Sequence, residues 1–300
     1  MPHPALARHA PFCGILVDRI GIQYKGSDDI RRAFFGADDH GTLRPSVPDA
    51  RSPARHGAGR GKIAGVIMKE EFARSISVAD EIRTSGRWTA LNQKICQLAD
   101  NHNGYEAWQI QVLAALSARN FSEYLALKKA YEDTGSEPSL LAWRARNLLE
   151  ISVWSLYCAQ STENARVFYK DAGRDVVDLC RAFTDWGTST SQGNDWLDSI
   201  ADVKQDISQR AATVGIESLE ETYTRLTNVV DKCGLGVPFK PTYRKLSKFA
   251  HPTAMLIMAL PDMEKEKVQR DMFYSDGCVF FVNAFTTLER ALSVLVENPA

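Results

Sequence analysis

The sequence lacks several features that would identify a protein class at once. Its 300 residues carry 36 lysines and arginines against 37 aspartates and glutamates, so the net charge is only −1. Such a chain has no overall electrostatic attraction for duplex DNA or a membrane surface. Its longest apolar run near the start, residues 12–17, is far below the roughly 20 residues of a spanning helix. We therefore expect a cytoplasmic protein without a membrane segment or signal peptide.

Metal and cofactor motifs are also missing. No two of the six cysteines lie within four residues of each other, which excludes the usual zinc spacing, and we expect them to serve as core hydrophobes in a reducing cytosol. No phosphate-binding loop, dinucleotide-binding glycine motif or G-x-S-x-G string occurs. Two acidic rows would spread their carboxylates along a helix, up to about 16 Å in the second, and predict solvated faces rather than a metal site. These rows are Asp171, Asp175 and Asp178, and then Asp195, Asp198, Asp202 and Asp206.

Residues 1–67 differ from the rest of the chain. They hold six of the 12 prolines, nearly half of the 19 glycines, and ten basic against six acidic side chains. A segment of this composition buries too little apolar surface to offset its ordering entropy, so it is predicted to be a disordered leader. Two alternatives are a basic arm that touches nucleic acid and a natural translation start at Met68.

From Met68 onward the apolar residues recur at helical spacing with almost no strand pattern, which predicts an all-α antiparallel helical bundle. We divide it into an N-terminal helical segment, 68–136, and a second helical domain, 137–300. Helices are expected from Asn120 to Tyr131, following one around residues 108–116, and then over residues 139–160, 196–214 and 217–233, with a last helix from about Asp276. Pro138 suits a first helical turn, and Ser161 suits an N-cap.

Histidine is scarce in this helical part, where only His102 and His251 occur. His102 lies in an Asn-His-Asn-Gly turn signature and is expected to be an exposed loop residue. His251 closes the segment Y-R-K-L-S-K-F-A-H-P, in which Arg244 lies seven residues earlier. On a helix the two would share a face about 10.5 Å apart in rise, and Pro252 places His251 at the helix end. A plain helix cap beside a solvated basic face is the alternative.

This segment resembles the signature of the HEPN superfamily (higher eukaryotes and prokaryotes nucleotide-binding domains), in particular a group of bacterial HEPN-like proteins with a Tyr-x-x-Leu-Ser-x-x-x-His segment. A second similar piece is R-N-L-L-E from Arg146 to Glu150, and the resemblance covers roughly residues 137–297. It implies a HEPN-like bundle. Many members are metal-independent ribonucleases whose arginine and histidine meet across a dimer.

The resemblance and the chemistry of RNA cleavage together assign expected roles. Arg244 clamps the phosphate and His251 transfers protons, while Tyr243 and Ser247 position the 2′-hydroxyl beside an open groove. Arg146 and Glu150 brace the site. Because one chain supplies a single well-placed histidine for two proton transfers, a homodimer is expected, with RNA or a nucleotide as ligand and no metal or cofactor.

Two alternatives stay open. One is a non-catalytic HEPN-like module that binds a nucleotide or protein partner, as in toxin–antitoxin or phage-defence systems. The other is a purely structural bundle.

Overall fold

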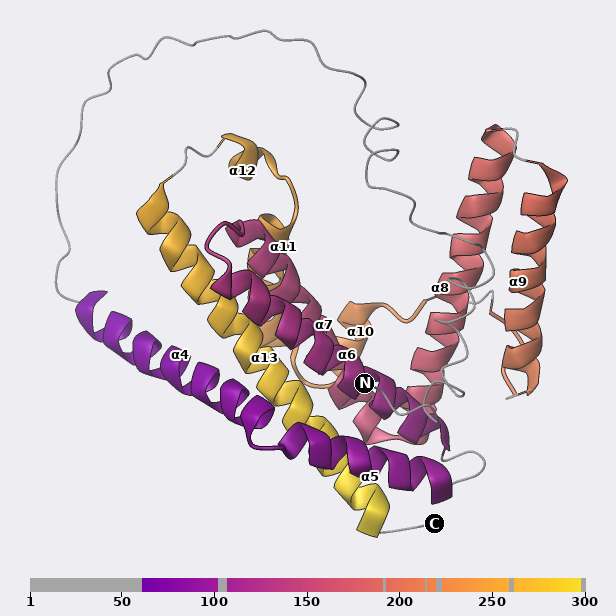
Figure 1. Ribbon diagram of the computed structural model, residues 1–300, viewed down its shortest axis with the longest axis horizontal. Helices are drawn as coiled ribbons and strands as arrows, with labels where there is room; N and C mark the ends of the chain where they lie inside the picture. Colours follow the sequence, from indigo (N-terminus) through magenta and orange to yellow (C-terminus); the bar gives the residue numbers. More distant parts are fainter. Residues whose placement is uncertain are drawn as a thin grey trace, which may run out of the picture.

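The protein is described by a computed structural model over residues 61–101, 107–190, 193–213, 215–219, 223–258 and 262–297 (Figure 1). Within these ranges every regular element is an α-helix, which confirms the predicted all-α class. The helices are α4 (Gly61–Thr84), α5 (Arg87–Asn101), α6 (Ala107–Glu132), α7 (Pro138–Gln160), α8 (Thr162–Ser189), α9 (Asn194–Thr213), α10 (Leu226–Lys232), α11 (Gly236–Ala250), α12 (Ala254–Met258) and α13 (Met263–Glu297).

Helix α7 lies at the centre of the fold and contacts α6, α8, α10, α11 and α13. Pro138 occupies its first turn as predicted, because the missing N–H of proline costs nothing there. Ser161 ends α7 and caps α8, where its hydroxyl accepts from the backbone N–H of Asn164 at 3.1 Å. That cap confirms the prediction and fixes the point at which the chain leaves the bundle core.

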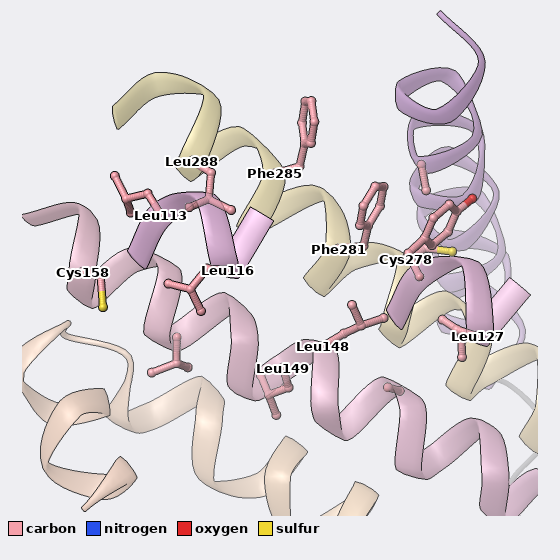
Figure 2. Packing of buried hydrophobic residues seen from close by; sticks show 14 of the residues in the cluster. Leu113, Leu116, Leu127, Leu148, Leu149, Cys158, Cys278, Phe281, Phe285 and Leu288 are labelled. Carbon is pink, nitrogen blue, oxygen red and sulfur yellow. The ribbon is translucent and has the colours of Figure 1, made fainter. Parts of the chain in front are cut away.

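The main hydrophobic core forms where α6, α7 and α13 meet. Leu113 and Leu116 of α6 lie beside Leu288 of α13, and Leu148 of α7 belongs to the same cluster (Figure 2). Gly277 of α13 lets this helix approach closely, since a Cβ there would overlap the side chain of Leu127. Helices α4 and α5 cover another side of α13 (Figure 1).

Helix α13 is longer than expected. It begins at Met263 rather than near Asp276, because its first turns carry charged residues that hide the helical pattern. Arg270 in these turns caps the end of α6, where its guanidinium donates to the carbonyl oxygens of Tyr131, at 2.7 Å, and Asp133, at 2.9 Å. Residues 263–295 are long and apolar enough to cross a membrane, a criterion that core helices also meet. Within this range, Phe273, Phe281 and Leu292 are buried and pack in the main core of the bundle.

Two expected helix boundaries require correction, and the expected division of the chain stays a prediction. Helix α4 begins at Gly61, within the predicted leader 1–67, while residues 1–60 and His102 lie outside the described ranges. The main hydrophobic cluster contains residues from both sides of the expected division at residue 137. Helix α6 is continuous where two helices were expected, since no breaking residue separates them. The helix expected over 217–233 is only α10, Leu226–Lys232.

Helices α8 and α9 form a pair beside the bundle with a small core of their own (Figure 1). Of the first acidic row, Asp171 accepts from the backbone N–H of Thr224 at 3.2 Å, and Asp178 accepts from the hydroxyl of Tyr223 at 2.7 Å. The second row lies mostly exposed along α9. Among the residues that the structure describes, no group of three or more histidine, cysteine or acidic side chains is placed to hold a metal ion.

Candidate functional site around Arg146 and His251

Helix α11 carries the segment that begins at Tyr243 and places His251 at its C-terminal end. Phe239 and Leu246 are buried against the main core, and the ring of Phe249 lies 5.0 Å from that of Phe273. His251 leaves the helix with φ −114° and ψ 150°, the extended conformation that a following proline favours. The predicted helix end at His251 is therefore confirmed, and its imidazole is exposed.

Helix α7 brings Arg146 to this imidazole. The Nη1 atom of Arg146 lies 2.7 Å from Nε2 of His251, and Nη2 donates to the hydroxyl of Tyr243 at 2.6 Å. Its Nε lies 3.2 Å from Oε1 of Glu150, one helical turn further along α7. The guanidinium carbon also stands 4.8 Å from the centre of the Tyr243 ring. We call Arg146, Glu150, Tyr243 and His251 the Arg146 cluster.

The contact between Arg146 and His251 is a hydrogen bond in only one tautomer of the ring. A guanidinium has five N–H donors and no acceptor, so Nε2 of His251 accepts in that hydrogen bond. The hydrogen bond therefore needs the tautomer that carries its hydrogen on Nδ1. An imidazole in this state has its basic lone pair directed at Arg146.

The side chains of Arg244 and Ser247 form no hydrogen bond with His251 in the described part of the chain, and their expected roles stay predictions. Arg244 is exposed, and no described residue forms an ion pair or hydrogen bond with it. The guanidinium at His251 belongs to Arg146 instead, which was expected only to brace the site. The hydroxyl of Ser247 is buried and has no hydrogen-bond partner in the described part of the chain. Seven residues of rise separate Arg244 from His251, whereas the neighbouring helix α7 brings Arg146 alongside it.

The two helices that form the cluster are held by buried charges on their other sides. On α11, the ammonium of Lys245 lies 2.6 Å from a carboxylate oxygen of Asp276 on α13. Burial raises the pKa of Asp276, and the ammonium of Lys245 opposes that rise. On α7, Asn147 donates to the buried carboxylate of Glu123 at 3.1 Å. These contacts fix the faces that α7 and α11 turn toward each other.

Two hollows of about 350 and 270 Å³ in the described part of the chain lie along α8 and α9, against residues 215–219. Neither is lined by a residue of the Arg146 cluster. The groove expected beside His251 is therefore not one of these two hollows, and the imidazole of His251 is exposed.

The sequence contained a signal for the role of Arg146. An Arg–Glu pair at i and i+4 stands within an apolar stretch of α7, where a surface ion pair is out of place. Its partner on α11, 105 residues away, depends on how the two helices pack. Comparisons with protein-family models, with curated proteins and with solved structures found no match to this chain.

Proposed function

We propose that this protein is a metal-independent endoribonuclease with a HEPN-like bundle, in which His251 transfers protons and Arg146 binds the reacting phosphate. The observation that supports this most is the 2.7 Å contact between the exposed imidazole of His251 and the guanidinium of Arg146. A neutral imidazole is a suitable general base, and a guanidinium stabilises the negative charge that develops on a phosphate.

The resting contact provides a way for the substrate to activate the base. A phosphate oxygen is a stronger acceptor for an arginine N–H than a neutral ring nitrogen, because both partners are charged. A phosphate that reaches Arg146 would take the Nη1 hydrogen bond away from His251. The freed Nε2 would then accept the 2′-hydroxyl proton while the 2′-oxygen attacks phosphorus. The bond from phosphorus to the 5′-oxygen breaks, leaving a 2′,3′-cyclic phosphate and a 5′-hydroxyl.

The departing 5′-oxygen needs a proton from a second group. His251 is the one histidine in the Arg146 cluster, so we propose that a second copy of the chain supplies the protonated imidazole. The exposed imidazole of His251 is accessible to that copy. The functional unit is then a cytoplasmic homodimer.

The second candidate is a non-catalytic module that binds a nucleotide, an RNA or a protein partner through the same residues. The contact between Arg146 and Nε2 of His251 favours this candidate, because it gives the ring nitrogen a hydrogen-bond partner without a substrate. In that case the protein would recognise its ligand without cleaving it, as a component of a toxin–antitoxin or phage-defence system would.

Cleavage of end-labelled RNA in the presence of a chelator tests the proposal. We expect the wild type to cleave, and both His251→Ala and Arg146→Gln to lose at least 100-fold in rate, in line with the loss of a general base. His102→Ala is the matched histidine control and should cleave like the wild type. Equal cleavage by His251→Ala would contradict the proposal, and RNA binding without cleavage by the wild type would favour the non-catalytic module.

A further inference from the structure

The exposed face of α11 carries a row of three cations that leads to His251. Lys240, Arg244 and Lys248 follow each other at four-residue intervals, so they lie on neighbouring turns about 6 Å apart in rise. All three are exposed, and none has an ion pair or hydrogen-bond partner among the described residues. We call these three residues the α11 row.

The rest of α11 shows that this row is unusual. The helix contains no aspartate or glutamate, so no acid lies three or four residues from any of the three cations on the helix. Lys245, the one other cation of α11, faces α13 and is paired with Asp276 at 2.6 Å. The cation that faces a neighbouring helix therefore has a carboxylate partner, and the three that face solvent have none.

Several other exposed cations are paired along their own helix, whereas others, among them Arg74, Lys129 and Arg290, are not paired in the described part of the chain. Three such pairs join residues three or four positions apart: Arg83–Asp80, Arg181–Asp178 and Arg210–Asp206. Like charges at i and i+4 instead repel each other and destabilise a helix. The negative end of the helix dipole favours Lys248 in the last turn, but it does not favour Lys240. An anionic ligand that neutralises the row would offset this repulsion.

We infer that the α11 row binds successive phosphates of a single RNA strand and leads that strand to His251. This inference rests on the proposed function for the position of the reacting phosphate. A single line of cations along a helix can contact the phosphates of one nucleic-acid strand, as positively charged grooves do in proteins that bind single-stranded nucleic acids. Beyond His251, α12 exposes the apolar side chains of Met255, Ile257 and Met258. Unpaired bases can contact such a surface, whereas bases inside a duplex are stacked and covered.

The salt dependence of RNA binding measures the number of phosphates that the row neutralises. Each phosphate contact contributes about 0.7 to the slope of log K against log salt for a single strand, so three contacts contribute about 2. We would measure the fluorescence anisotropy of a labelled single-stranded RNA on the full chain carrying His251→Ala, which removes cleavage. Adding Lys240→Gln, Arg244→Gln and Lys248→Gln should reduce the slope by about 2 and weaken binding at least tenfold at low salt.

A matched control removes the same charge elsewhere. Arg74, Lys129 and Arg290 are exposed, lie on α4, α6 and α13, and have no ion pair in the described part of the chain. The variant Arg74→Gln, Lys129→Gln and Arg290→Gln should retain both the slope and the affinity. Equal weakening in the two triple variants, or weakening in neither, would overturn the inference. Duplex RNA of the same sequence should bind more weakly, and equal binding would overturn the assignment to a single strand.

This experiment separates the failure of the row from the failure of the proposed function. If the α11 row variant loses RNA binding while the wild type cleaves no RNA, the inference that the row binds RNA is supported and the ribonuclease proposal fails. If the wild type cleaves RNA in chelator while the α11 row variant binds RNA as well as its control, the inference about the row fails and the ribonuclease proposal is supported. Far-ultraviolet circular dichroism of both triple variants confirms that α11 is still folded.

Discussion

Arg146 organises the candidate site because its guanidinium can face three partners at once. One edge reaches the imidazole of His251, another the hydroxyl of Tyr243, and Nε faces the carboxylate of Glu150. The planar fork of an arginine can hold this arrangement, whereas a lysine ammonium on a flexible stem would not. Removing the hydroxyl of Tyr243 would take one hydrogen-bond acceptor from the guanidinium of Arg146 and leave the other residues of the cluster in place.

We predict that Tyr243→Phe lowers kcat for RNA cleavage about tenfold and leaves KM nearly unchanged. The ring, which lies 5.1 Å from that of Phe239, keeps its packing, and only the acceptor for Nη2 of Arg146 is lost. Losing this hydrogen bond should also lower the free energy of unfolding by about 1 kcal/mol, measured in urea. Tyr131→Phe is the control, because its hydroxyl donates to Asp271 at 2.7 Å. It should leave kcat unchanged, and an unchanged kcat in Tyr243→Phe would show that Tyr243 does not position Arg146.

At the scale of the elements, one charge pair joins α11 to α13 beside the ring contact of Phe249 with Phe273. Burial raises the pKa of Asp276 above its ordinary value of 3.8, so ionisation of this carboxyl costs stability in the folded state. That cost is absent at low pH, where folded and unfolded chains are both protonated, and it grows as the pH rises through the raised folded pKa. Lys245 offsets the cost with an ammonium 2.6 Å away.

We predict that Lys245→Met lowers the free energy of unfolding by about 1 kcal/mol at pH 7.5, because it leaves a buried carboxylate without its partner. The loss should shrink as the pH falls toward 4, and adding Asp276→Asn should restore most of it. Urea unfolding at several pH values measures both effects. The control Lys265→Met removes a surface pair with Asp262 and should have little effect at any pH. A loss that stays constant across the pH range would contradict this account of Asp276.

At the scale of the whole molecule, the site depends on one large core. The cluster that holds α7, α11 and α13 extends to α4 and α5, whereas α8 and α9 share a separate small cluster. The faces of α7 and α11 that carry Arg146 and His251 are therefore fixed by the main core. The chain places one imidazole in the site, and the proposed reaction needs two.

We predict that mixtures of wild type and His251→Ala lose activity as the square of the wild-type fraction after subunits exchange. This dependence follows if each functional unit needs His251 from two chains. A linear loss would show that one chain acts alone. Sedimentation velocity should show a dimer at the concentrations of the cleavage assay, and a monomer that cleaves RNA would contradict the two-histidine reaction.

Much of the local structure could be predicted from the sequence because its causes are local. Pro138 begins α7, the hydroxyl of Ser161 caps α8, and Pro252 ends α11 at His251. The predicted core residues of α13, among them Phe281 and Leu288, are buried. The charged start of α13 was missed because a helix that is stabilised by packing on its neighbours need not show a regular apolar pattern of its own.

The sequence by itself determined that the chain is helical, that its one promising histidine stands at a helix end, and that Arg146 and Glu150 lie on one face of an apolar helix. Periodicity, caps and prolines act over a few residues, so these conclusions did not need the fold. Only the tertiary structure decided which arginine meets His251. That contact joins residues 105 positions apart, and it forms because the main core packs α7 against α11 and leaves Arg244 facing solvent.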